Sequence, residues 1–260
     1  MLLIDVNALL SRGARSRVKV GIGGSSAVLA DTKRLISSSG GRIPLVGFEE
    51  PRDLVVSLKR GEIGVAVRGT LSSSKVLQCL KDEFRLKEVM RAAVLEDSRG
   101  KPFILAPVGI DEGIDYPSRI RLASATIEYF SRLGWDLKTG ILSKGRLEDG
   151  SRGLQIKMSL EEGEMLAKVL REQGANARHY AILVEDAVKE CDLVIAPDGV
   201  SGNLIFRSLH FVGATRAYGA PVVNLDKVFV DTSRGKADFS DSVLFAAGLA
   251  ESRSKPMKQA

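Results

Sequence analysis

A serine, an arginine and a glycine stand next to each other at Ser233, Arg234 and Gly235, shortly before a helical pattern that spans 241–253. The serine offers a hydroxyl, the arginine a planar fork of charged donors, and the glycine a flexible backbone. Unpaired backbone N–H groups at a helix start add further donors. Together these features suit an anionic, phosphorylated ligand, although so short a segment is a weak signal alone.

A second segment with the same character lies upstream. The run Pro197-Asp198-Gly199-Val200-Ser201-Gly202-Asn203 follows an aliphatic strand pattern over 193–196 and opens another predicted helix. Its small and polar side chains stand where helix N–H groups are unpaired. We therefore take Ser201, Gly202 and Asn203 as candidate binding residues.

A third segment, Arg68-Gly69-Thr70, follows the predicted strand 64–67 and precedes a helix start marked by three serines. Open α/β sheets bind ligands beyond the carboxyl ends of their strands, so Arg68 and Thr70 are candidate phosphate-binding residues. A surface arginine next to a serine helix cap explains the same residues about equally well. The sequence leaves these two interpretations open.

Several other site classes are disfavoured. The run from Gly21 to Ser26 has serine where a dinucleotide-binding loop needs its third glycine, so a tight strand-to-helix turn is the better interpretation, and no phosphate-binding P-loop occurs. Neither His179 nor His210 has a partner at metal-ligand spacing, which predicts structural or surface roles and no metal site. No nucleophile elbow points to a hydrolase.

Composition sets the broad class. The 260 residues carry a formal charge of +6, but aromatic residues are 5% and no basic stretch is interleaved with them, which argues against nucleic acid. Cys79 and Cys191 stand far apart, as buried thiols of a reducing cytosol would. The apolar start of the chain is too short for a signal peptide, and no stretch suits a membrane helix. We expect a soluble cytoplasmic protein.

Short aliphatic runs alternate with amphipathic ones, which predicts an α/β fold with a mainly parallel sheet. The exception is a predicted antiparallel hairpin, whose turn is Glu96 to Gly100. Ser143 to Gly153 is rich in glycine, serine and charge and reads as a mobile loop. The expected strands cover 18–22, 43–46, 64–67, 103–106, 138–142, 193–196 and 221–225. The other expected helices cover 26–38, 52–60, 73–83, 118–133, 160–173, 184–190 and 204–218.

These segments, in this order, resemble the phosphate acetyl/butyryltransferase family over roughly the last two-thirds of the chain. The matching pieces are Pro197 to Asn203, Gly213-Ala214, Gly219 to Val222, Ser233 to Gly235, Asp241 and Ala246-Ala247, with 103–109, 118–134 and 138–143 before them. The short form of the chain and the run from Pro107 to Gly113 look most like an archaeal branch of that family, the methanogenesis marker protein 4 or methyltransferase-related MtxX group.

The resemblance implies an isocitrate/isopropylmalate dehydrogenase-like fold with two α/β domains, a cleft between them and a homodimer. We expect residues 1–107 plus 225–260 in the first domain and 108–224 in the second. The implied reaction moves an acyl group between coenzyme A and phosphate, without a metal or a tightly bound cofactor. A rival expectation from the MtxX group is an accessory or phosphometabolite-binding protein associated with a methyltransferase complex.

The resemblance also implies residue roles. Asp241 would remove the thiol proton of coenzyme A, Ser233 would stabilise the developing negative charge, and Arg234 would hold the acyl phosphate. One extra residue separates Ser-Arg-Gly from the acidic position, so Asp238 is a rival for the role of Asp241. The chain is also shorter than typical phosphotransacylases, near the N-terminus and after the 143–153 loop.

Overall fold

The computed structural model describes residues 4–253, and the chain divides into two compact units. Among the described residues, the terminal unit consists of Asp5–Val89 and Tyr218–Arg253, and the central unit consists of Met90–Ala217 and includes Ile4. The divisions fall at 89/90 and 217/218, whereas the sequence led us to expect 107/108 and 224/225. The difference arises because the hairpin strands before residue 107 pair with strands of the central unit.

The terminal unit has a sheet in the order β2-β1-β3-β10-β9. Four strands are mutually parallel, namely β1 (Val20–Gly23), β2 (Leu45–Phe48), β3 (Val65–Val67) and β10 (Val228–Asp231). The antiparallel member is β9 (Arg216–Pro221), which pairs with β10. Strands β1, β3 and β10 are fully buried, as expected for aliphatic runs covered on both faces.

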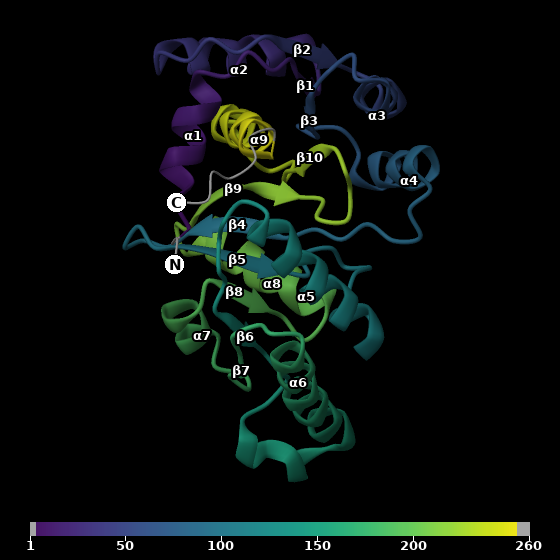
Figure 1. Ribbon diagram of the computed structural model, residues 1–260, viewed down its shortest axis with the longest axis vertical. Helices are drawn as coiled ribbons and strands as arrows, with labels where there is room; N and C mark the ends of the chain where they lie inside the picture. Colours follow the sequence, from purple (N-terminus) through teal and green to yellow (C-terminus); the bar gives the residue numbers. More distant parts are fainter. Residues whose placement is uncertain (1–3, 254–260) are drawn as a thin grey trace. The chain divides into compact units, whose positions relative to one another are not determined.

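Helices cover both faces of this sheet (Figure 1). On one face lie α3 (Pro51–Arg60) and α4 (Ser73–Phe84), whose leucines and valines pack on Phe229 and Ala66. On the other lie α1 (Val6–Ala14), α2 (Ser26–Ser38) and α9 (Ser240–Arg253). Residues Ser242 to Leu249 of α9 are all buried, so this helix is the centre of that face.

The central unit has a sheet in the order β4-β5-β8-β6-β7. The antiparallel pair is β4 (Ala93–Glu96) with β5 (Pro102–Ala106), and β5, β8 (Leu193–Ile195), β6 (Thr139–Ile141) and β7 (Ala177–His179) run parallel. Its helices are α5 (Tyr116–Ser131), α6 (Leu154–Glu172), α7 (Val184–Glu190) and α8 (Gly199–Arg207), with a 3-10 turn over Leu147–Arg152 and a π-turn over Ser208–Val212. Within residues 4–253, no helix has the length and apolar character to cross a bilayer.

Most predicted elements are confirmed, including the mainly parallel α/β architecture and the antiparallel hairpin. Gly100 has the positive φ of 81° that its turn requires. The predicted mobile loop 143–153 holds the 3-10 turn over Leu147–Arg152. At the strand-to-helix turn after β1, Ser25 is the N-cap and α2 begins at Ser26, where the sequence predicted the helix to start.

Two predictions were wrong in the same region. Of the expected strand 221–225, only Pro221 lies in a strand, as the last residue of β9, and 222–225 belong to the connection to β10. The expected helix 204–218 ends in the π-helix over Ser208–Val212, before β9 begins. The strand that leads into Ser233 is therefore β10. The sequence pattern indicated neither strand. Strand β9 contains Gly219 and Pro221, which weaken a strand pattern, and β10 is only four residues long. Strand β7 and helix α1 were missed as well.

The crossing of α1 over α9 generates a test of the packing in the terminal unit. A Cβ added to Gly248 would lie 2.1 Å from the carbonyl oxygen of Leu9. We expect Gly248→Ala to lower the free energy of unfolding by about 1–2 kcal/mol, because overpacking outweighs the gain of about 1 kcal/mol in helix propensity. Urea unfolding measures the change, with Gly153→Ala as a control because a Cβ there meets nothing within 4 Å. Equal or greater stability of the Gly248 variant would contradict the close approach.

Candidate active site

The loops that follow β1, β3 and β10 share one edge of the terminal-unit sheet, because the three strands are parallel. Backbone hydrogen bonds hold these loops together. The Thr70 N–H donates to the Gly23 carbonyl over 3.0 Å, and the Arg68 N–H donates to the Val230 carbonyl over 3.0 Å. The edge is therefore a rigid frame into which the Ser-Arg-Gly segment is built.

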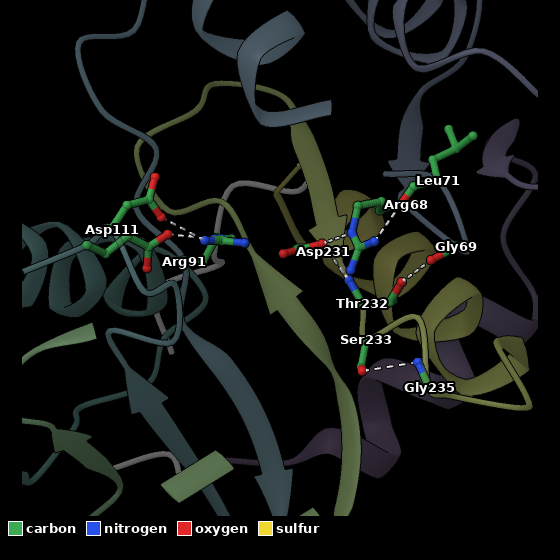
Figure 2. Close-up of polar contacts among 10 residues, drawn as sticks. Arg68, Gly69, Leu71, Arg91, Asp111, Asp231, Thr232, Ser233 and Gly235 are labelled. Carbon is green, nitrogen blue, oxygen red and sulfur yellow. Dashed lines mark hydrogen bonds and ion pairs between the residues drawn. The ribbon is translucent and has the colours of Figure 1, made fainter. Parts of the chain in front are cut away.

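A buried ion pair reinforces this frame. The guanidinium of Arg68 donates through Nε to Oδ1 of Asp231 and through one terminal nitrogen to the Leu71 carbonyl at 2.6 Å. Arg68 and Asp231 are 4% and 7% exposed, so water competes little for either charge. Oδ1 of Asp231 also accepts from the Thr232 N–H at 2.9 Å (Figure 2). The pair thus joins the end of β3 to the residue that precedes Ser233.

Thr232 and Gly69 complete the link between the two loops. The Thr232 hydroxyl donates to the Gly69 carbonyl over 3.0 Å (Figure 2). Gly69 has a φ of 59°, and a Cβ there would lie 1.8 Å from the Gly23 carbonyl oxygen. Only glycine fits where three strand ends approach so closely.

The Ser-Arg-Gly segment forms a turn at this edge. The Lys236 N–H donates to the Ser233 carbonyl over 3.2 Å. The Gly235 N–H lies 3.3 Å from the Ser233 hydroxyl oxygen (Figure 2). Ser233 is half-buried, whereas Arg234 is exposed. The turn fixes the serine and leaves the arginine side chain in contact with solvent, where an anion can reach it.

The start of α9 distinguishes the two acidic candidates. Both carboxylate oxygens of Asp238 accept from Ser240, from its N–H at 2.7 Å and from its hydroxyl at 2.9 Å. Asp238 therefore has a local role at the helix start. Asp241 is half-buried in the first turn of α9, where a carboxylate is electrostatically favoured. This geometry favours Asp241 for the role of base, which stays a prediction.

The predicted site residues fall into two groups. The terminal unit gathers Arg68, Thr70, Ser233, Arg234 and Asp241 at the carboxyl edge of its own sheet. The structure already engages Arg68 in the ion pair, so its predicted direct contact with phosphate stays a prediction. Ser201, Gly202 and Asn203 belong to the central unit.

In the central unit, Asp198 begins helix α8. Its carboxylate accepts from the Ser201 N–H at 2.8 Å and contacts the ammonium of Lys144 at 2.8 Å. Burial alone would raise the pKa of Asp198, but Lys144 and the Ser201 donors outweigh burial and hold the pKa below its usual value. Asp198 is thus a charged helix cap at neutral pH.

Gly202 and Asn203 fix α8 against the segment that follows β5. A Cβ on Gly202 would lie 1.9 Å from the Pro107 carbonyl oxygen, and the Asn203 amide donates to the Val108 carbonyl over 2.8 Å. Helix packing therefore explains why glycine and asparagine stand here. Their predicted contact with a ligand, like that of Ser201, stays a prediction.

Sequence reasoning missed three residues of the site, namely Asp231, Thr232 and Lys236. Asp231 and Thr232 fix the backbone that leads into the turn through their hydrogen bonds. The Lys236 ammonium donates to the Ser242 hydroxyl over 3.0 Å. An acidic residue at the end of an aliphatic run is a signal that could have pointed to Asp231. Nothing local indicates its partner, which lies 163 positions away.

Both histidines lie within hydrogen-bonding distance of neighbouring polar groups, and the structural or surface roles that their sequence context predicts stay predictions. The Nε2 atom of His179 lies 2.6 Å from the hydroxyl of buried Ser143, and Nδ1 of His210 lies 2.8 Å from the Thr215 carbonyl. Within residues 4–253, no three histidine, cysteine or acidic side chains are grouped as metal ligands would be.

No family model matches the chain. A protein of Methanosarcina mazei is named "Putative methyltransferase mtx subunit X". It is 37% identical to this chain over an alignment 268 positions long, which covers 95% of each chain.

Solved structures share the fold at low sequence identity. A branched-chain phosphotransacylase from Enterococcus faecalis superposes with a TM-score of 0.70 at 17% identity, over 90% of this chain and 99% of its own. A 4-hydroxythreonine-4-phosphate dehydrogenase from Klebsiella pneumoniae gives 0.55 at 10% identity, over 94% and 86%. These likenesses confirm the α/β fold with its mostly parallel sheet.

The buried ion pair between Arg68 and Asp231 leads to a prediction about stability. We expect Asp231→Ala to lower the free energy of unfolding by about 3–5 kcal/mol, because it leaves the Arg68 charge buried without its partner. The double variant Arg68→Met/Asp231→Leu should recover much of that loss, since it removes both charges. Urea unfolding of the three proteins measures both effects.

The exposed pair Arg34–Asp31 provides the control, since its side chains are 72% and 67% exposed. Asp31→Ala should change stability by less than about 1 kcal/mol. An equally small effect of Asp231→Ala would show that the buried pair does not hold the frame.

Proposed function

Because this chain belongs to the archaeal family whose members are named methyltransferase mtx subunit X, and shares its fold with phosphotransacylases, we propose that it is a phosphotransacylase-like transferase. It moves an acyl group between coenzyme A and phosphate, with coenzyme A as a substrate and no tightly bound cofactor. The same proposal includes a cytoplasmic location, a homodimer and the finer assignment to the two-domain isocitrate/isopropylmalate dehydrogenase-like fold.

The observation that supports the proposal is the Ser233-Arg234-Gly235 turn at the carboxyl edge of the terminal-unit sheet, where the neighbouring loops hold it in place. It combines a half-buried hydroxyl, an exposed guanidinium and a carboxylate in the first turn of the next helix, on Ser233, Arg234 and Asp241. Acyl transfer to or from phosphate needs these three functions, which are a base for the thiol, a donor for the oxyanion and a cation for the phosphate.

The proposed reaction is written from acyl phosphate to coenzyme A. Asp241 accepts the proton of the thiol, and the thiolate sulfur attacks the acyl carbon, forming the C–S bond. The carbonyl oxygen gains negative charge, which the Ser233 hydroxyl stabilises by donating a hydrogen bond. The oxygen returns its electron pair, the C–O bond to the phosphoryl group breaks, and phosphate leaves while paired with Arg234.

The frame behind the turn gives this chemistry its precision. Catalysis by positioned groups requires that the donors stay aimed at the place where charge develops. The Arg68–Asp231 pair and the Thr232 hydroxyl hold the backbone of the turn from the buried side. We propose that Arg68 acts mainly through this frame, and that Thr70, in the neighbouring loop, contributes its hydroxyl to phosphate binding.

The name of the M. mazei relative favours a second candidate, from a different class. A chain named as a methyltransferase subunit suggests an accessory protein that binds a phosphorylated metabolite in the same frame and associates with a methyltransferase without transferring acyl groups. The ordered Ser233-Arg234-Gly235 turn, with Asp241 on the next helix, suits transfer chemistry as well as binding, so acyl transfer is the first candidate.

We expect Arg234→Ala to lower kcat/KM for acyl phosphates by about 10²- to 10³-fold, the usual effect of removing one charge-stabilising donor from an acyl-transfer site. The assay measures thioester formation from coenzyme A with acetyl, propionyl and butyryl phosphate. The matched control is Arg60→Ala, an exposed arginine in the last turn of α3, at the opposite end of that helix from the carboxyl edge. Equal activity of both variants and the wild type would refute the site assignment.

The accessory candidate makes its own prediction. A tagged copy expressed in its native host should bind a methyltransferase, and the tagged methyltransferase should in turn bind this chain. Mass spectrometry of both complexes checks the result, alongside the acyl-transfer assay of the purified chain. Reciprocal binding without turnover of any acyl phosphate would replace the first candidate by the second, whereas turnover without binding would dismiss the second.

A further inference from the structure

Helix α8 of the central unit presents its large apolar side chains to solvent. Its buried residues are Gly199 and Gly202, which pack directly on the backbone that follows β5. Val200 and Leu204 are 53% and 60% exposed, and Phe211, in the π-turn that continues the helix, is exposed as well. A surface helix normally has the opposite arrangement, with its large apolar residues inside. This arrangement indicates that another surface covers the outer side of α8.

The exposed side chains form one stripe along the helix. Positions 200, 204, 207 and 211 follow a spacing of three or four residues, so they lie on one side, opposite the two buried glycines. The guanidinium of Arg207 lies 5.2 Å from the ring centre of Phe211, so the one charge within the stripe rests on an aromatic face. Val212, at the end of the stripe, is 85% exposed.

A neighbouring loop extends the stripe at the N-terminal end of α8. A Cβ on Gly199 would lie 1.8 Å from the Gly109 carbonyl oxygen and 2.6 Å from that of Glu112, so the loop contacts the first turn of the helix. Among residues 4–253, exposed large apolar side chains lie only in the central unit. The loop and the stripe together make the α8 face, which consists of Ile110, Ile114, Val200, Leu204, Phe211 and Val212.

The two ends of the α8 face carry opposite charges. Asp111 and Asp115 are exposed in the loop at the N-terminal end. Asp111 shares Arg91, 3.6 Å away, with the buried Glu112, so this end keeps a net negative charge. The exposed Arg207 lies at the C-terminal end of α8. Two copies of the face that meet in antiparallel orientation therefore bring each basic end to the acidic end of the other.

We propose that the α8 face is the surface through which two copies of this chain form a symmetric dimer. The inference rests on the homodimer of the proposed function and names its contact surface. With the two-fold axis near Leu204, Phe211 and Val212 of one copy meet Ile110 and Ile114 of the other. The apolar stripe is thereby removed from water, while the charged groups pair at its ends.

Sedimentation velocity of the full chain, with Leu204→Glu beside wild type, tests the proposal. We expect wild type to sediment as a dimer and Leu204→Glu to weaken the dimer at least about 100-fold, because each dimer loses two buried leucines and gains two carboxylates at its axis. The matched control is Leu147→Glu, which should leave the dimer intact, since Leu147 is 73% exposed in the 3-10 turn, outside the α8 face. Urea unfolding of each variant confirms that it folds.

The two-fold axis also permits a test that does not depend on dissociation. A short bis-maleimide should link Leu204→Cys to the same position in the other copy, giving a product of twice the chain's mass on a denaturing gel. Leu147→Cys should give no such product, and wild type, with its half-buried Cys79 and buried Cys191, sets the background. A dimer that persists in Leu204→Glu and gives no Leu204→Cys product would overturn the proposal.

A methyltransferase is the rival occupant of the α8 face. A monomeric wild type would overturn the dimer, and if Leu204→Glu then abolished binding of that monomer to a methyltransferase, the face would be assigned to that partner. Acyl transfer is assayed separately on the same proteins. A dimer that uses the α8 face but turns over no acyl phosphate would end the first functional candidate and leave this surface standing, whereas an active monomer would do the reverse.

Discussion

The buried ion pair between Arg68 and Asp231 is the interaction on which the candidate site depends. Two opposite charges with little access to water are costly to separate, so the ends of β3 and β10 are held in one arrangement. The same carboxylate accepts the Thr232 N–H, and Thr232 binds back to Gly69. The turn that begins at Ser233 thus starts from backbone that cannot easily move.

The two units use similar types of polar and small residues for different structural purposes. In the terminal unit, a charge pair and close backbone contact fix loops around an exposed arginine, Arg234. In the central unit, the polar and small residues Asp198, Gly202 and Asn203 cap α8 and pack it against the segment after β5. Motif residues with similar composition therefore have different evident roles in the two units.

Family and fold constrain function from two directions. The relationship to mtx subunit X proteins extends over nearly the whole chain, whereas the likeness to phosphotransacylases and to a phosphate-ester dehydrogenase lies in the fold. Folds of this kind serve many reactions, so the reaction must be argued from side chains. The assembly of Ser233, Arg234 and Asp241 on one braced turn and helix start is what makes acyl transfer the first proposal.

The sequence by itself determined the α/β class, the hairpin around Gly100 and the Ser233-Arg234-Gly235 segment before a helix, because each depends on residues close together in the chain. It did not determine that β10 leads into this segment, since four residues give too little periodicity for a prediction. Nor could it show that Asp231 pairs with Arg68, or that Lys236 reaches Ser242. Those contacts arise when parallel strands and a helix start meet at one sheet edge, which only tertiary packing brings about.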